Sequence, residues 1–105
     1  MRISLIISTY NSPEALEVCL RSVLRQTANP YEVIIADDGS TDSTPEVIDR
    51  FTKEAKFPVV HVWQKNEGFR LATIRNKAIA RAKGDYIVQI DGDIMLHPEF
   101  IADHA

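Results

Sequence analysis

The sequence predicts an α/β fold, with a mainly parallel sheet that helices cover on both faces. Short apolar runs rich in β-branched residues alternate with amphipathic stretches of roughly 10 to 15 residues, the pattern of consecutive β-α-β units. Right-handed crossovers then pack the helices against the sheet. With 105 residues, 45% of them hydrophobic, the chain can form a single core. We therefore expect one domain over residues 1–105.

Four segments have the character of buried strands. Residues 3–8, 33–36, 59–63 and 86–90 are short and almost wholly apolar. Loops are indicated at Ala28-Asn29-Pro30 and at Phe57-Pro58, because proline and asparagine interrupt regular structure there. The chain contains no internal repeat, low-complexity tract or linker, which supports a single fold unit.

Two helices are expected in the first half of the chain. The first begins near Pro13, and its apolar residues recur at intervals of three and four along one face: Leu16, Cys19, Leu20, Val23 and Leu24. The second begins at Ser43-Thr44-Pro45-Glu46, where a hydroxyl side chain is predicted to cap the helix and proline lies in the first turn. Its apolar stripe consists of Val47, Ile48 and Phe51, and it should end before Phe57.

A third helix is expected over residues 71–82, closed by Gly84. Its residues are assigned as inward (Ile74, Ala78, Ile79 and Ala82) or mostly outward (Arg75, Lys77, Arg81 and Lys83). Residues 99–105 have the character of the start of another helix after Pro98, without a glycine cap or a basic last turn. We therefore expect the sequence to be cut short after the segment around Asp93.

Composition excludes several classes of function. The net charge of −3, with 26% charged residues of mixed sign, provides no broad basic surface for nucleic acid. The single cysteine, Cys19, forms no internal disulfide and is expected to be buried in the first helix. The first apolar run is much shorter than the about 20 residues of a membrane span. We expect a soluble cytoplasmic chain without a transmembrane segment, which in a full-length protein works in the cytoplasm or at the inner face of the membrane.

Polar clusters follow all four predicted strands: Thr9-Tyr10-Asn11-Ser12, Asp37-Asp38-Gly39-Ser40-Thr41-Asp42, Gln64 to Arg70, and Asp91-Gly92-Asp93. The carboxyl ends of parallel strands share one edge of the sheet, and ligands of open α/β sheets bind at that edge. We therefore expect the four clusters to converge on one site.

Asp91-Gly92-Asp93 is the most specific of these clusters. Carboxylate oxygens are preferred ligands of Mg²⁺ and Mn²⁺, whose remaining positions accept substrate phosphates. In an extended segment Asp91 and Asp93 point the same way, and Gly92 lets the backbone approach closely. A surface turn uses the same residues, but the position after an apolar strand and opposite a second acidic pair favours a metal site. The two acidic clusters would repel each other unless a cation or hydrogen-bond donors lay between them.

Asp37 and Asp38 are candidates to accept hydrogen bonds from a base or a ribose, although a turn before a helix cap uses the same residues. The sequence has no G-x-G-x-x-G or G-x-x-x-x-G-K-[ST] phosphate loop, so a metal is expected to hold the phosphates. Arg70 and Arg75 could pair with phosphate or base edges, or remain solvated. Tyr10 could flank the base or pack in its loop.

Other aromatic and histidine side chains receive no role. Trp63 and Phe69 are expected to pack rather than to stack on a base. His61, His97 and His104 show no metal-ligand spacing such as H-E-x-x-H.

Five motifs in order resemble those of family 2 glycosyltransferases: Ser8-Thr9-Tyr10-Asn11, Asp37-Asp38-Gly39-Ser40-Thr41-Asp42, Asn66-Glu67-Gly68, Arg75-Asn76-Lys77-Ala78 and Asp91-Gly92-Asp93. The resemblance covers nearly the whole chain. It implies the GT-A fold, a Rossmann-like sheet that binds a nucleotide-diphosphate sugar, usually a UDP-sugar, with Mn²⁺ or Mg²⁺, and transfer with inversion to a glycan, lipid-linked or other hydroxyl acceptor.

The resemblance also implies residue roles. Thr9, Tyr10 and Asn11 would line the nucleotide pocket, Asp37 or Asp38 would bind uracil or ribose, and Arg75 would lie near the base and diphosphate. Asp91 would lie near the ribose and the metal, and Asp93 would ligate the metal. Gly68-Phe69-Arg70 with Arg75-Asn76, and Asp91-Gly92-Asp93 before Met95 and Pro98, are similar to bacterial chondroitin-polymerase-type transferases. Gly68 and Arg70 are also assigned to the nucleotide site.

No catalytic residue is assigned, because the base that activates the acceptor lies after the D-x-D segment in this family, beyond residue 105. Two other interpretations remain open. One is a non-catalytic nucleotide-binding module. The other is a Mg²⁺-dependent phosphotransferase or phosphatase, in which the D-x-D triplet follows the first strand and its leading Asp is a nucleophile, whereas here that strand ends in Thr9-Tyr10-Asn11.

Overall fold

The computed structural model describes residues 2–40, 43–65 and 71–104. For residues 71 and 72, at the start of the third helix, it describes the main chain only. The elements follow in the order β1 (Ile3–Thr9), α1 (Pro13–Leu24), β2 (Glu32–Asp37), α2 (Thr44–Glu54), β3 (Val59–Trp63), α3 (Leu71–Arg81), β4 (Tyr86–Asp91) and α4 (Phe100–His104). Each strand lies within one residue of its predicted bounds. The α/β class is confirmed.

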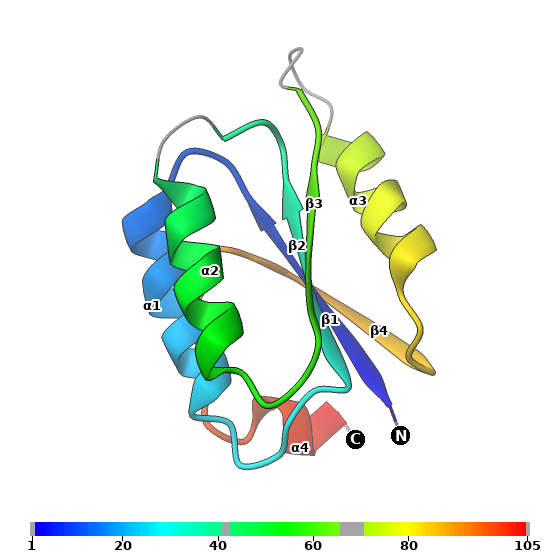
Figure 1. The fold of residues 1–105 in the computed structure, drawn as a ribbon. Coiled ribbons are helices and arrows are strands. Elements are labelled where there is room, and N and C mark those ends of the chain that lie inside the picture. The colour runs from blue at the N-terminus through cyan, green and yellow to red at the C-terminus, as the bar shows by residue number, and fades with distance from the viewer. Residues whose placement is uncertain (1, 41–42, 66–70, 105) are drawn as a thin grey trace.

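The four strands form one parallel sheet in the order β3-β2-β1-β4. Helices α1 and α2 cover one face and α3 covers the other (Figure 1). This arrangement follows from the connections: the first two crossovers move the chain from β1 through β2 to β3, and the third returns it past β1 to β4. Because all crossovers are right-handed, a crossover that runs across the sheet in the opposite direction places its helix on the opposite face, as α3 does.

The expectation that all four strands are buried is wrong for β3 and β4. Every residue of β1 and β2 is buried, whereas exposed residues occur throughout the two outer strands. In β4 the side chains of Val88 and Ile90 face the core under α1, and Ile87 remains 38% exposed. The reason is strand order: β3 and β4 lie at the two edges of the sheet, where one neighbour and part of the helical cover are lacking.

The helices match their predicted buried faces except at Ile79, and α2 lacks its predicted side-chain cap. Leu16, Cys19, Leu20 and Val23 of α1 are buried, as are Val47, Ile48 and Phe51 of α2. On α3, Ile74 and Ala78 are buried, but Ile79 is 36% exposed because only a narrow stripe of this helix contacts the sheet. Ser43 stands at the N-cap of α2 without a side-chain capping bond, since its φ of −83° and ψ of 11° are not the extended values of a capping residue.

Among the described residues, no helix combines the length and the apolar character needed to cross a membrane.

Candidate functional site

The carboxyl ends of the strands are aligned. Ser8 pairs with Asp91, Thr9 with Asp37, and Asp37 with Trp63, so the residues that end the four strands lie in one row along the edge of the sheet. The strands after β1 are added on the β2 side of the sheet, whereas β4 is added on the other side of β1. The boundary between β1 and β4 is therefore the topological switch point, where α/β sheets bind ligands. The predicted convergence is therefore present for the described residues of all four clusters, since Gln64 after β3 bonds to Asp38. Thr41, Asp42 and residues 66–70 lie outside the described residues.

The carboxylate of Asp37 organises the loop after β2. It is fully buried; Oδ1 accepts the Ser40 backbone N–H at 2.9 Å, and Oδ2 lies 2.8 Å from Nε2 of His61 on β3. Gly39 has a φ of 87°, a left-handed conformation that favours glycine and turns the chain back toward Asp37. With both oxygens engaged, Asp37 supports the shape of the loop.

Asp38 is the more accessible of the two acidic residues. Its side chain is 9% exposed, and Oδ1 accepts a hydrogen bond from Nε2 of Gln64 at 2.8 Å. Its backbone N–H donates to the carbonyl of Thr9 at 3.1 Å, which ties the loop to the end of β1. Among the described residues Oδ2 has no partner and it is not enclosed, so it can accept a hydrogen bond from a ligand.

The loop after β1 contacts the loop after β2. Thr9 is buried, Tyr10 is 48% exposed, and Asn11 has a φ of 44°. The Asn11 backbone N–H donates to the Ser40 hydroxyl at 2.9 Å. The loops after β1 and β2 are therefore connected through Ser40, and Tyr10 projects beside them.

Arg75 joins α3 to the ends of β1 and β4. Its Nε donates to the Ser8 hydroxyl at 3.2 Å, and a terminal nitrogen pairs with Oδ1 of Asp91 at 3.0 Å. Arg75 belongs to the group predicted to point mostly outward; its side chain is 36% exposed, and these two contacts hold its guanidinium against the edge of the sheet. Ser8 and Asp91 supply its acceptors, and neither is close to Arg75 in sequence.

Gly92 is constrained by packing. Its backbone N–H donates to the Ser8 carbonyl at 2.7 Å, and an added Cβ would lie 2.7 Å from that same oxygen. Any larger residue would push the segment away from β1. The glycine of the triplet therefore keeps the flanking aspartates close to the sheet edge.

The expectation of an extended Asp91-Gly92-Asp93 triplet is wrong. Strand β4 ends at Asp91 and the chain then turns, with the Ile94 N–H donating to the Asp91 carbonyl at 3.2 Å. Asp91 contacts Arg75. The pKa of the Cys19 thiol in α1 is raised to about 12, first by burial and second by the negative charge of Asp93. Of the two carboxylates, only that of Asp91 is tied to a helix by a hydrogen bond within the described part of the chain.

Hydrogen-bond donors separate the acidic clusters. Asp37, Asp38 and Asp91 each receive a donor from the protein, which relieves the repulsion expected between them. Asp93 is exposed and has no hydrogen-bond or ion-pair partner in the described part of the chain. Within that part no three His, Cys, Asp or Glu residues gather as a metal cage. Two exposed carboxylates suit a Mg²⁺ or Mn²⁺ ion that takes its other oxygen ligands from phosphates and water.

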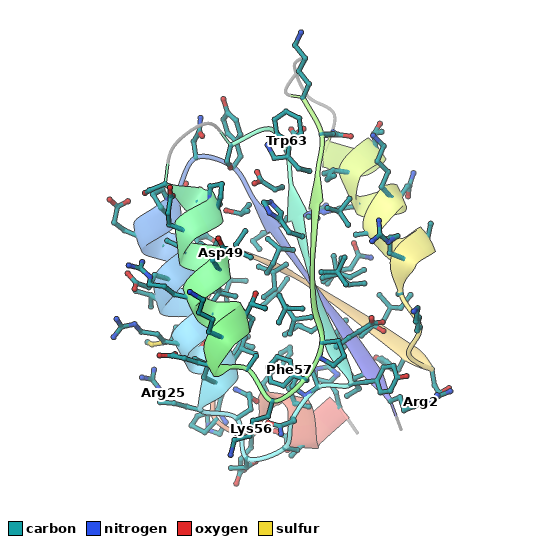
Figure 2. The ribbon with its side chains drawn as sticks, in the orientation of Figure 1. Arg2, Arg25, Asp49, Lys56, Phe57 and Trp63 are labelled. Atoms are coloured by element: carbon teal, nitrogen blue, oxygen red, sulfur yellow. The ribbon has the colours of Figure 1, made fainter. Side chains whose placement is uncertain are left out.

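Two side chains without a predicted role are part of this edge. His61 contacts Asp37, and Trp63, expected to be packed, is 50% exposed with its Nε1–H donating to the Ser40 carbonyl at 3.2 Å. Figure 2 shows Trp63 at the end of the sheet opposite Arg2 and Lys56. The alternation of β3 puts both rings on the Asp37 face, but only the pairing with β2 reveals their partner. Gly68, Phe69 and Arg70 lie outside the described residues.

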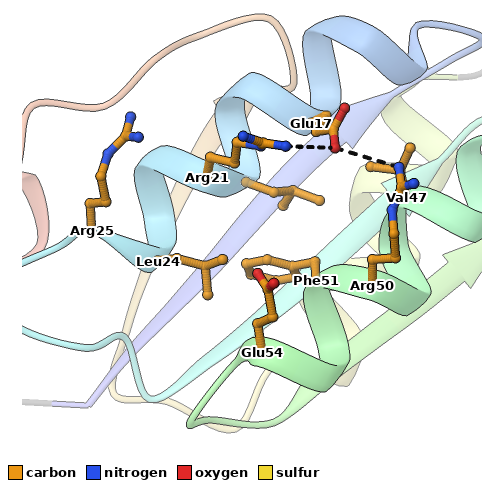
Figure 3. Close-up of a pocket in the computed structure, with 9 residues that line it drawn as sticks. Glu17, Arg21, Leu24, Arg25, Val47, Arg50, Phe51 and Glu54 are labelled. Atoms are coloured by element: carbon orange, nitrogen blue, oxygen red, sulfur yellow. Dashed lines mark hydrogen bonds and ion pairs between the residues drawn. The ribbon is translucent and has the colours of Figure 1, made fainter.

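A separate groove of about 420 Å³ lies between α1 and α2, away from the sheet edge (Figure 3). Its floor includes Leu20 and Phe51, and Glu17 on its rim pairs with Arg21 at 3.3 Å and Arg50 at 3.5 Å. The negative charge of Glu17 thereby compensates part of the positive charge of both arginines. This groove does not resemble the predicted nucleotide site.

Known proteins share both sequence and architecture with this chain. The sequence model described as "Glycosyl transferase family 2" matches residues 4–105. Chondroitin synthase of Escherichia coli is 33% identical over 103 residues, which cover 97% of this chain and 15% of that protein. The predicted similarity to chondroitin-polymerase-type transferases is therefore confirmed.

Two solved structures are similar in fold. S. aureus TarS in complex with UDP-GlcNAc matches with a TM-score of 0.80 and 28% identity, over 99% of this chain and 30% of that one. The mannosyltransferase PcManGT of Pyrobaculum calidifontis, in complex with GDP-Man and Mn²⁺, matches with a TM-score of 0.76 and 29% identity, over 88% of this chain and 27% of that one.

The chain spans less than a third of the length of these relatives. The solved structures share the overall fold over 99% and 88% of this chain. A family match across nearly the entire sequence, together with this architecture, means that the chain belongs to family 2 of the glycosyltransferases.

Proposed function

We propose that this chain is the donor-binding part of an inverting glycosyltransferase that takes a nucleotide-diphosphate sugar, most simply a UDP-sugar. The observation that carries the proposal is that Thr9, Asp38 and Asp91 lie together along the sheet edge at the topological switch point, with Arg75 beside Asp91. The solved complexes of TarS with UDP-GlcNAc and of PcManGT with GDP-Man and Mn²⁺ support a nucleotide-sugar as the ligand.

Different residues of the site contact different parts of the donor in this proposal. Asp38, through its accessible Oδ2, accepts a hydrogen bond from the base or ribose, while buried Asp37 keeps the loop in shape. Tyr10 flanks the base, and Thr9 and Asn11 shape the pocket around it. Arg75 holds Asp91 toward the ribose and brings positive charge toward the diphosphate.

A divalent cation, Mn²⁺ or Mg²⁺, would be held by Asp93 together with Asp91 and the donor phosphates. The oxygen donors and their exposure fit such a hard ion. When bound, the ion supplies positive charge for a departing diphosphate. The chain's own part is to present Asp93 unpaired and to keep Asp91 close to β1 through the Gly92 contact.

The acceptor in this proposal is a glycan or lipid-linked hydroxyl, and the reaction takes place in the cytoplasm or at the inner face of the membrane. Activation of the acceptor requires a general base. None of residues 1–105 is assigned that role, so the proposal for this chain concerns donor capture.

The test is calorimetric titration with UDP and a UDP-sugar, with and without Mn²⁺. We expect metal-dependent binding that Asp93→Ala abolishes. Asp49→Ala, which removes an exposed carboxylate from α2, is the matched control and should bind normally. If the folded chain bound no nucleotide with either metal, the proposal that these residues capture the donor would be wrong. Binding that ignored the metal would contradict the role given to Asp93.

A further inference from the structure

Trp63 is the only tryptophan in the sequence, and it lies at the nucleotide end of β3 with half of its surface exposed. A tryptophan that served only the core would bury most of its large apolar area. Here its Nε1–H donates to the Ser40 carbonyl, which fixes one edge of the indole to the loop after β2. The ring is thus held at the site with surface left for a ligand.

Tyr10 lies just after β1, on the other side of β2 from β3. It is 48% exposed, and the next residue, Asn11, donates its N–H to the Ser40 hydroxyl. Because β2 lies between β1 and β3, the two aromatic residues come from strands on opposite sides of the Asp37–Ser40 loop. Those strands are two spacings, or about 10 Å, apart. A planar base in contact with a ring on each face needs about 3.5–4 Å on each side.

The loop between the aromatic residues presents an acceptor. Asp38 follows β2, and its Oδ2 is left for a ligand while Gln64 holds Oδ1. A nucleobase placed there would offer a face to each ring and an N–H edge to the carboxylate. Stacking on aromatic side chains is a strong and base-tolerant source of affinity.

We propose that Trp63 forms the second wall of a base-binding slot whose first wall is Tyr10 and whose edge acceptor is Asp38. The inference rests on the proposed donor site and adds a residue that determines affinity for the nucleobase. The hydrogen bond to Ser40 positions the indole, and the exposed ring face contacts the base.

Tryptophan fluorescence tests this contact directly, because the signal comes from Trp63 alone. UDP is titrated in the presence of Mg²⁺, which avoids the paramagnetic quenching of Mn²⁺, and pyrophosphate with Mg²⁺ serves as the ligand without a base. We expect UDP to change the emission in a saturable way at the concentrations at which calorimetry detects binding. Pyrophosphate should leave the emission unchanged.

Variants separate stacking from the hydrogen bond to Ser40. Trp63→Ala should bind UDP about tenfold more weakly while its affinity for pyrophosphate stays the same. Trp63→Phe loses the indole N–H but keeps a ring, so it should retain most of the affinity. Tyr86→Ala, which removes an exposed aromatic ring at the other end of the sheet, is the control and should bind like the parent.

The outcomes distinguish the two proposals. If UDP binds in calorimetry but the emission does not change and Trp63→Ala binds normally, the slot is wrong and the donor site stands. If Trp63→Phe loses as much affinity as Trp63→Ala, the indole acts only by holding Ser40, which also overturns the slot. If neither UDP nor pyrophosphate binds, the donor site itself is contradicted and the slot with it.

Discussion

Adjacent residues have different tasks at the end of β2. The strand alternation turns Asp37 toward the α1 and α2 face, where it is fully buried between Ser40 and His61, and Asp38 follows it into the loop with an accessible oxygen. Sequence alone left both residues as candidates for the base or ribose. Their burial and partners give Asp37 a structural role and leave Asp38 as the carboxylate that we propose for the ligand.

This division predicts opposite phenotypes for two variants. Asp37→Ala should lower the free energy of unfolding by about 1–3 kcal/mol, because it leaves the Ser40 N–H and the His61 ring without their partner. Asp38→Asn keeps an oxygen for Gln64 and should be nearly as stable as the parent, but should bind UDP roughly tenfold more weakly. Urea unfolding and calorimetry measure the two effects. Equal stability of Asp37→Ala and the parent would refute the structural role.

At the level of elements, α4 depends on contacts made by the segment that follows α1. Phe100–His104 has only five residues, too few to be a stable helix alone. Gln26, just after α1, donates from Nε2 to the His97 carbonyl at 2.8 Å and accepts the Ile101 N–H at 2.9 Å. Ile101 is also buried in the core. The segment that follows the D-x-D triplet is therefore anchored under the α1 layer (Figure 1).

Removing the Gln26 side chain should loosen this segment selectively. In Gln26→Ala we expect the Ile101 amide to exchange with solvent roughly ten- to a hundredfold faster, since one hydrogen bond and its buried partner are lost. Amides of β1 should keep their protection. Arg25→Ala, the exposed neighbour, is the control. Uniformly faster exchange across the sheet would mean that Gln26 supports the whole domain instead.

At the level of the whole molecule, the thiol of Cys19 links folding to pH. Burial in the core and, secondly, the charge of Asp93 raise its pKa from 9.0 to about 12. Between these values the unfolded chain releases a proton that the folded chain retains. The contribution to stability is therefore complete below pH 9 and decreases as pH rises toward 12.

The free energy of unfolding should consequently fall more steeply with pH in the parent than in Cys19→Ala over this interval, by up to about 1.4 kcal/mol per pH unit. Urea titrations at several pH values give the slope of the free energy of unfolding against pH for the parent and for Cys19→Ala. The difference between the two slopes cancels the contribution of the tyrosines and lysines, which both proteins share. Folded parent protein should also resist a thiol reagent at pH 8 and react once unfolded. Parallel pH profiles for the two proteins would show that Cys19 ionises normally in the folded state.

The sequence by itself determined the helices and strands, the α/β class, the two helical layers and the edge where polar residues gather. These features follow from local periodicity and from the handedness of crossovers, which act over short stretches of chain. The bounds of β1 and β4 and the apolar face of α1 are examples. Family motifs such as Asp91-Gly92-Asp93 belong to the same class of local signal.

Tertiary structure alone decided which polar residues meet. Arg75 reaches Ser8 and Asp91, and His61 reaches Asp37, only because the strand order and register bring distant segments together. The same long-range pairing left β3 and β4 at the edges and kept Trp63 exposed. Side-chain partners across a sheet depend on how strands pair over large sequence separations, which no local pattern encodes.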